Sequence, residues 1–176
     1  MKHSKEYTIQ FKGLKPGMHQ FNYLIDKKFF DTYQYDDFID SKINLVVDFN
    51  KKSTLFELFF SISGTVLINC DVSGEEFNQP VKGSLSLIVK FGDEFNNDNE
   101  EILVIPHNEY EIDLSQYIYE LIVLSVPIKR IHPGVLDGTL KSKAIDKLEK
   151  MQDNAQNNKI DPRWDKLKEL IKDKKS

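Results

Sequence analysis

Alternating hydrophobic and polar residues mark a series of strands in the N-terminal two thirds of the chain. A period of two is typical of a strand with one buried face. Pro16-Gly17 predicts a turn that joins the first two strands in a hairpin, and the last three strands are predicted to pair as antiparallel neighbours. The strands are expected at residues 7–11, 21–25, 43–49, 56–70, 85–91 and 102–106.

Three positions within this region carry further expectations. The segment 56–70 is too long for a flat strand, and Gly64 in its middle predicts a bend or bulge. Cys70 falls on the apolar phase of the same strand, so it is expected to be buried. Residues 26–33, between the second and third strands, are compatible with one helical turn that places Phe29 and Phe30 inward.

The period changes at residues 113–126, which predict a helix. Asp113 is in the N-cap position and Gln116 follows three residues later, the arrangement of a capping box. Pro127 ends the helix. A stripe this apolar indicates a helix buried against the sheet, and its members are Leu114, Tyr117, Ile118, Leu121 and Ile122.

The C-terminal part is predicted to be helical and separate from the rest. Residues 142–152 indicate a weak helix, and the polar stretch 152–159 reads as a linker. A last helix then begins with Asp161 as its cap and Pro162 at its first position. We therefore expect an α+β body over residues 1–140 and a basic helical segment over 141–176. The body is expected to hold a bent antiparallel sheet of about six or seven strands, open or partly closed into a barrel, with the buried helix packed on it.

Charge is distributed unevenly along the chain. The net charge is −4, but residues 128–176 hold 13 Lys/Arg against 8 Asp/Glu. The preceding residues hold 11 against 20, which follows from totals of 24 and 28. The basic C-terminal third suggests an anionic partner, although Lys-rich helices are more often simply solvated faces. No apolar run approaches the ~20 residues that span a bilayer, so we expect a cytoplasmic protein without a membrane partner.

Motifs for catalysis or for cofactor and metal binding are not evident in the sequence. The glycines form no phosphate-binding loop, and the four histidines lack metal-ligand spacing. The single cysteine is more simply a buried, inert thiol than a nucleophile. The acidic stretch 93–101 lacks the spacing of a calcium loop and reads as a solvated hairpin tip. We therefore expect a protein that is not an enzyme and that has no cofactor and no metal.

Two segments remain as candidate binding sites. Lys129, Arg130 and His132 lie in a loop between Pro127 and Pro133, which is a candidate for phosphate contact or an ordinary soluble loop. Near the C-terminus, Arg163 and Trp164 follow the helix start. That tryptophan either packs on its own domain or anchors the chain in a partner.

These features together resemble the YceD-like family, described as large ribosomal RNA subunit accumulation proteins. The resemblance rests on "GTVLINCDVSGEEF", "IDLSQYIYELIVLSVPIKRIHP" and "DPRWDKLKEL", and it spans Gly64 to Leu170. The last motif is the most specific, because its six defining positions all match at fixed spacing. The family often has Cys-x-Arg-Cys where this chain has Cys-Asp-Val-Ser, so a metal or redox role of paired cysteines cannot be carried over.

The resemblance implies a bacterial, non-enzymatic and RNA-binding factor in large-subunit assembly or in accumulation of its RNA. Its partners would be the large-subunit precursor or the ribosomal RNA, with a ribosomal protein as a further option. The alternative is a protein–protein adaptor that docks through its C-terminal helix without RNA. The candidate site residues for RNA or partner binding are Lys129, Arg130, His132, Asp161, Pro162, Arg163, Trp164 and Leu167.

Overall fold

The computed structural model describes residues 5–99, 101–140, 144–147 and 150–151. Contacts divide the chain into two compact units, one of residues 1–69 with 76–130 and the other of residues 70–75 with 131–176. The predicted boundary near residue 140 stays a prediction, because residues 141–143 and 152–176 lie outside the described part of the chain. Each unit is described below by itself.

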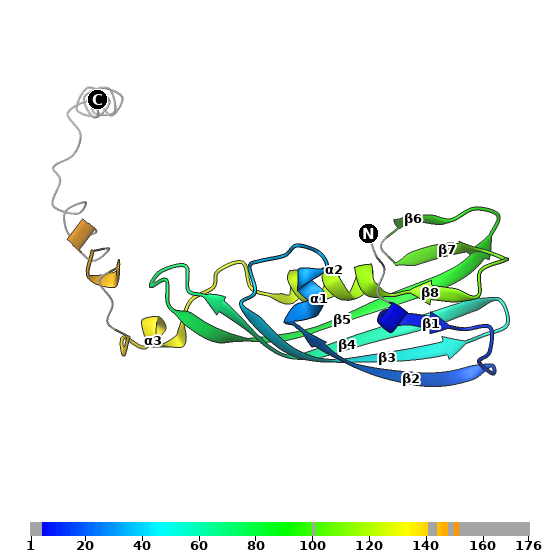
Figure 1. Ribbon diagram of the computed structural model, residues 1–176, viewed down its shortest axis with the longest axis horizontal. Coiled ribbons are helices and arrows are strands. Elements are labelled where there is room, and N and C mark those ends of the chain that lie inside the picture. Colours follow the sequence, from blue (N-terminus) through cyan, green and yellow to red (C-terminus); the bar gives the residue numbers. More distant parts are fainter. Residues whose placement is uncertain (1–4, 100, 141–143, 148–149, 152–176) are drawn as a thin grey trace, which may run out of the picture. The chain divides into compact units, whose positions relative to one another are not determined.

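The larger unit is built on a six-stranded sheet with the order β2-β3-β4-β5-β7-β6 (Figure 1). A second sheet pairs β1 with β8, and the helical elements are η1, α1 and α2. This is the α+β fold with a mostly antiparallel sheet that the periodicity predicts. The strands of the large sheet are β2 (Gly17–Asp26), β3 (Asp40–Lys51), β4 (Leu55–Asn69), β5 (Glu76–Gly92), β6 (Asn96–Asn99) and β7 (Ile102–Pro106). The remaining elements are η1 (Lys5–Tyr7), β1 (Thr8–Gln10), α1 (Lys27–Asp31), β8 (Glu111–Asp113) and α2 (Ser115–Ser125).

Strand pairing differs from the sequence prediction in three respects. The predicted hairpin of the first two strands is wrong, because β1 pairs with β8 through Thr8 and Asp113 while β2 pairs with β3. The strand β7 runs parallel to β5, which the prediction did not foresee. After β5 the chain first forms β6 at the edge of the sheet and then returns as β7, which lies between β5 and β6. The large sheet is open, with β2 and β6 at its edges, so partial closure into a barrel is not supported.

Gly64 is required by a close approach of two strands, and the predicted bulge is wrong. The register of β4 runs without a shift through Gly64 on both sides, opposite Ile43 and Val81. A Cβ atom at this position would lie 2.2 Å from the carbonyl oxygen of Lys42. Because a hydrogen atom fits where a methyl group does not, glycine allows β3 to lie against β4 here.

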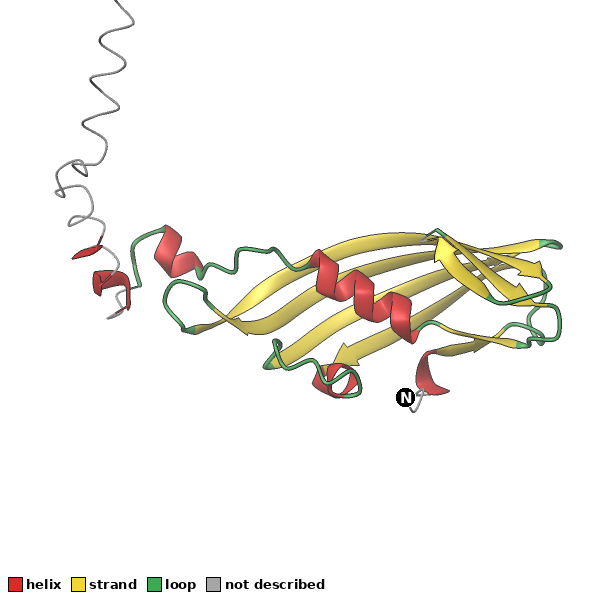
Figure 2. Cartoon of the chain, turned by 90° about the horizontal axis from the view of Figure 1, so that it is seen from above, coloured by secondary structure: helices red, strands yellow, loops and turns green. Residues whose placement is uncertain are grey.

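The core lies between one face of the sheet and the elements that cover it. Figure 2 shows α2 lying over this face, with Ile118 and Ile122 fully buried. Phe29 and Phe30 of α1 are buried as well, an arrangement that the sequence allows but does not by itself predict. Alternate residues of the central strands complete the core, among them Ile43, Leu45, Val47, Phe49, Phe56, Phe60 and Leu87.

The helix α2 begins two residues later than predicted, and the capping box is wrong. Asp113 accepts a hydrogen bond on Oδ1 from the backbone N–H of Ser115 at 2.8 Å, while Leu114 holds the N-cap position without a side-chain cap. Gln116 donates from Nε2 to Oε1 of Glu120 at 2.9 Å. The side-chain amide of Gln116 therefore bonds to Glu120, four residues later on the same helix face. In a capping box it would instead bond to the backbone of the N-cap residue.

The smaller unit contains the turn 70–75 and the short helix α3 (Pro133–Leu136). The turn is closed by two backbone bonds, from Gly74 N to the carbonyl of Cys70 at 2.9 Å and from Cys70 N to the carbonyl of Glu75 at 2.8 Å. Residues 144–147 and 150–151 are helical, within the predicted helix 142–152. Within the described residues, no helix is long and apolar enough to cross a membrane.

Candidate functional site

The structure assigns different environments to the two basic residues that follow α2. Lys129 is exposed. Arg130 donates from Nη2 to Oδ2 of Asp37 at 3.0 Å, and its side chain is 26% exposed. Burial disfavours the charged guanidinium, but the hydrogen bond to Asp37 outweighs burial and raises the pKa of Arg130. Lys129 is therefore open to solvent, and its part in RNA or partner binding stays a prediction, whereas Arg130 is engaged within its own unit.

Tyr35 completes the environment of Asp37. Its hydroxyl donates to Oδ2 of Asp37 at 3.3 Å, the same oxygen that accepts from Arg130. Burial raises the pKa of Tyr35, the charge of Asp37 raises it further, and Arg130 opposes both effects. The phenol therefore stays neutral at physiological pH and remains a donor to the carboxylate.

His132 serves as a helix cap in the smaller unit. Its Nδ1 accepts a hydrogen bond from the backbone N–H of Gly134 at 2.9 Å, at the start of α3. Its own backbone N–H donates to Sγ of Cys70 at 3.2 Å. The imidazole thus has a local structural role, and its part in RNA or partner binding stays a prediction.

Cys70 is buried, as the sequence predicts, but its sulfur is surrounded by N–H donors. The side chain is 3% exposed, and the backbone N–H of Ser73 lies 3.4 Å from Sγ. Burial raises the pKa of Cys70, but hydrogen bonds from the backbone of His132 and from Ser73 and Val72 outweigh it, so the pKa falls to about 7. Donors of this kind favour the thiolate, which differs from the inert thiol expected. Among the residues that the structure describes, no group of three His, Cys, Asp or Glu side chains could hold a metal ion.

Five of the predicted site residues lie outside the described part of the chain. They stay predictions, and they are Asp161, Pro162, Arg163, Trp164 and Leu167.

A groove on the larger unit was not anticipated from the sequence. It has a volume of about 1150 Å³ and is lined by residues of η1, β1, β2, α1, β6, β7, β8 and α2. We call it the acidic groove, because six carboxylates from distant parts of the chain line it. They are Glu6, Asp26, Glu109, Glu111, Asp113 and Glu120. The one local signal was the spacing of Glu109, Glu111 and Asp113, since alternate residues of an extended segment share a face.

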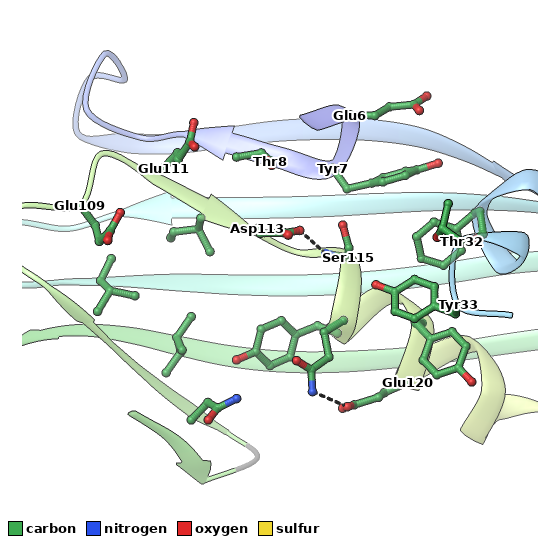
Figure 3. A pocket seen from close by; sticks show the side chains of 18 of the residues that line it. Glu6, Tyr7, Thr8, Thr32, Tyr33, Glu109, Glu111, Asp113, Ser115 and Glu120 are labelled. Carbon is green, nitrogen blue, oxygen red and sulfur yellow. Dashed lines mark hydrogen bonds between the residues drawn. The ribbon is translucent and has the colours of Figure 1, made fainter. Parts of the chain in front are cut away.

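Tyrosines form much of the remaining wall of the acidic groove (Figure 3). Tyr33 of the α1 region and Tyr119 of α2 stack with ring centroids 4.4 Å apart and an interplanar angle of 14°. Tyr7 packs edge-on against Phe29 at 5.0 Å. Burial raises the pKa of Tyr7 to about 12, with further contributions from Glu6, Asp26 and Tyr23. The groove therefore combines carboxylate side chains with neutral phenols.

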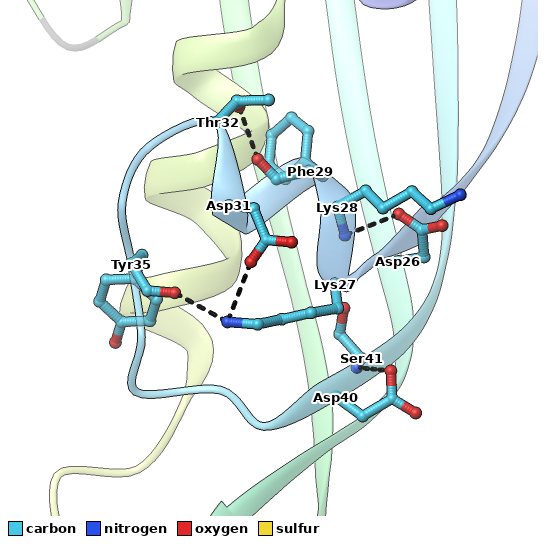
Figure 4. Close-up of polar contacts among 9 residues, drawn as sticks. All are labelled: Asp26, Lys27, Lys28, Phe29, Asp31, Thr32, Tyr35, Asp40 and Ser41. Carbon is cyan, nitrogen blue, oxygen red and sulfur yellow. Dashed lines mark hydrogen bonds and ion pairs between the residues drawn. The ribbon is translucent and has the colours of Figure 1, made fainter.

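Hydrogen bonds around α1 hold the wall that carries Tyr33 (Figure 4). Asp26 caps the helix by accepting from the backbone N–H of Lys28 at 3.1 Å. Lys27 contacts Asp31 at 3.3 Å and donates to the carbonyl oxygen of Tyr35 at 3.2 Å. Thr32 donates to the carbonyl oxygen of Phe29 at 2.6 Å. This short helix is thus closed at both ends by side-chain bonds, and Lys27 is committed to its own loop.

Comparison with known proteins gives one match. A family model described as "Large ribosomal RNA subunit accumulation protein YceD" matches residues 58–171. The matched region begins within β4 and includes α2, the basic loop and the terminal "DPRW" motif, but it excludes η1 and α1. No curated protein and no solved structure matches the chain.

Proposed function

Since the chain belongs to the YceD family of large ribosomal RNA subunit accumulation proteins, we propose that it is a non-enzymatic factor in large-subunit assembly. The observation that carries this proposal is the family match over residues 58–171, which is well over half of the chain. The proposed partner is the large-subunit precursor, which the chain would bind through the RNA of the precursor, its proteins or both. The proposal includes no catalytic step and no cofactor.

Lys129 is the residue of the basic loop that we propose for phosphate contact. It is exposed, and it follows Pro127, whose ring restricts the backbone of the loop. A lysine in such a position contributes affinity and orientation without reading a base. Arg130 would support this contact indirectly, because its bond to Asp37 holds the loop at the end of α2.

Trp164 and Arg163 are the proposed anchors of the C-terminal segment. Tryptophan and arginine are enriched among the residues that dominate binding energy at interfaces. Asp161, Pro162 and Leu167 belong to the same family motif, and we propose that they present the two anchors to the precursor.

The alternative is an adaptor that binds a protein through its C-terminal helix without contacting RNA. The acidic groove favours a protein partner, because six carboxylates would repel phosphate. The acidic balance of residues 1–127, 11 basic against 20 acidic, acts in the same direction. Salt dependence separates phosphate contact from docking through an apolar anchor of the C-terminal helix, since phosphate contacts release counterions and lose affinity steeply as salt rises.

Sedimentation of the purified full chain with large-subunit precursor particles tests the proposal. We expect comigration, and we expect Lys129→Glu to weaken it and to reduce the slope of log affinity against log salt by about one. Lys12→Glu is the matched control, because it makes the same charge change at an exposed site away from the loop. Trp164→Ala should weaken binding at all salt concentrations. A full chain that does not comigrate at low salt would refute the proposed function, and unaltered binding by Lys129→Glu would leave the adaptor.

A further inference from the structure

We infer that the acidic groove binds a lysine- and arginine-rich, extended segment of a partner protein. This site is distinct from the basic loop and from the "DPRW" motif, and it adds a second class of partner to the proposed contact with the precursor. The inference rests on the charge of the groove, its aromatic walls and a buried hydroxyl without a partner.

The groove is negatively charged, and its carboxylates are spread over several elements. Of the described residues that line it, six are acidic and one, Lys28, is basic. Those carboxylates come from η1, β2, β8 with its preceding turn, and α2, and no three donors in the described part of the chain gather closely enough to hold one metal ion. Carboxylates distributed along a groove suit several separate cationic side chains better than a single divalent ion.

The aromatic walls suit the two parts of a basic side chain. The faces of tyrosine rings attract ammonium and guanidinium groups, and Tyr33 with Tyr119 offers a stacked pair. The methylene stems of lysine and arginine pack on apolar surface while their charged ends reach polar partners. Leu24, which is 57% exposed, and Phe95, which is 60% exposed, supply that surface on the groove lining.

The negative field of the groove also acts on its own tyrosines. Burial raises the pKa of Tyr33, and the charge of Asp113 raises it further. Burial likewise raises the pKa of Tyr117, with Glu120 as the second cause. Both phenols therefore stay neutral, so they add no negative charge of their own to the groove.

Ser115 is an independent indication of a ligand. Its Oγ atom lines the groove, is buried, and has no hydrogen-bond partner among the described residues, and the residue is 6% exposed. In Figure 3 its hydroxyl points toward the space between Tyr7 and Tyr33. Ser115 lowers the pKa of Tyr33, so the two side chains are close, yet the Oγ atom of Ser115 makes no hydrogen bond within the described structure. A buried hydroxyl without a partner destabilises the fold, and a donor on the ligand would supply the missing bond.

The volume of the groove leaves room for a segment of polypeptide. Pockets for small ligands measure roughly 300–1,000 Å³, and this groove is larger at about 1150 Å³. RNA is disfavoured because the carboxylates repel phosphate. A protein segment with several basic residues matches the volume, the charge and the aromatic walls together.

Fluorescence anisotropy with a labelled peptide of alternating Lys and Arg tests the inference on the full chain. We expect Glu109→Gln combined with Glu111→Gln to weaken binding roughly tenfold. Glu75→Gln combined with Glu76→Gln is the matched control, because it removes the same charge from exposed positions outside the groove and should leave binding unchanged. Equal losses in the two double variants would show non-specific attraction and would overturn the proposed site.

Ser115→Ala separates a binding role from a structural one. Removing an unpaired buried hydroxyl should raise the melting temperature, whereas losing a bond to the ligand should lower peptide affinity. Unchanged affinity would remove Ser115 from the site. Two further probes test the occupant, a single-stranded RNA and a peptide with the sequence of residues 159–176. Binding of either one in place of the Lys/Arg peptide, with loss in the Glu109→Gln, Glu111→Gln variant, would overturn the assignment to a partner protein.

Discussion

Arg130 and Asp37 are separated by 93 positions in the sequence, and their side chains meet at 3.0 Å. The bond joins the end of α2 to the loop that follows α1. Its neighbour Lys129 is exposed and lies outside this bond. Two adjacent basic residues therefore have different consequences when they are changed, although their sequence context is almost the same.

Arg130→Glu is expected to lower the free energy of unfolding, while Lys129→Glu is not. The pair is partly exposed, with Asp37 at 56% and Arg130 at 26%, and such pairs contribute about 0–1 kcal/mol. A glutamate facing Asp37 adds repulsion, so a loss of about 1 kcal/mol is expected. Urea unfolding of the two variants measures the difference. The exchanged pair Asp37→Arg, Arg130→Glu should recover most of the loss, and a loss of equal size in Lys129→Glu would contradict this account.

Cys70 should make stability depend on pH between about 7 and 9. Its pKa in the folded chain is about 7, below the ordinary value of 9.0. The unfolded chain therefore binds more protons in this interval, so stability rises as the pH rises from 7 to 9 and the gain is lost as the pH falls through 7. Urea unfolding of the natural chain and of Cys70→Ala across this range measures the effect.

The informative quantity is the difference in unfolding free energy between these two chains. It should grow with pH, because the variant lacks the titrating group. The ultraviolet absorbance of the thiolate gives a second measurement, with a midpoint near pH 7 in the folded chain. A pH-independent difference together with a midpoint near 9 would show that the surrounding N–H groups do not stabilise the thiolate.

Gly83→Ala should destabilise the larger unit, because α2 lies directly against this position. A Cβ atom at Gly83 would lie 2.1 Å from Oγ of Ser125 and 3.2 Å from its Cβ. Overpacking of this kind costs about 1–3 kcal/mol. Gly13→Ala is the control, since a Cβ there meets nothing within 4 Å.

The same contact can be isolated with Ser125→Ala, which removes the nearest atom. In that background the cost of Gly83→Ala should be smaller, and the change in cost is the coupling energy of the pair. Denaturant unfolding of the four chains closes the cycle. Equal costs in both backgrounds would mean that the destabilisation arises from the strand backbone rather than from the contact with α2.

A chain that ends at Gln156 should unfold at nearly the same denaturant concentration as the full chain. The buried hydrophobic residues of the described structure run from Tyr7 to Val126, all of them before the point of truncation. The same truncation should lose most of its binding to precursor particles if Trp164 is an anchor. Aggregation or early unfolding of the truncated chain would instead place Trp164 in the core and remove it from the binding residues.

Local patterns in the sequence are enough to identify most of the residues that face the core. The alternation in β3, β4 and β5 and the helical spacing in α2 identify the buried faces of these elements, and the same alternation identifies Cys70 as buried. For Phe29 and Phe30 the sequence only allowed an inward position, which the structure shows. Periodicity is a local property, because each strand or helix reports which of its own faces avoids water. The same holds for the family motifs, whose spacing can be recognised without knowing what they contact.

Which segments lie next to one another could not be read from those local patterns and is known from the folded chain alone. The pairing of β1 with β8, the parallel pair β5 and β7, and the open sheet edge all depend on competition among distant segments, which alternation does not encode. The bond between Arg130 and Asp37 and the convergence of Glu6, Asp26 and Glu120 with the β8 carboxylates have the same origin. Charged side chains need not follow a regular spacing along the chain, because most of them stay in water. Their positions on the surface therefore follow from how the apolar faces of their strands and helices pack.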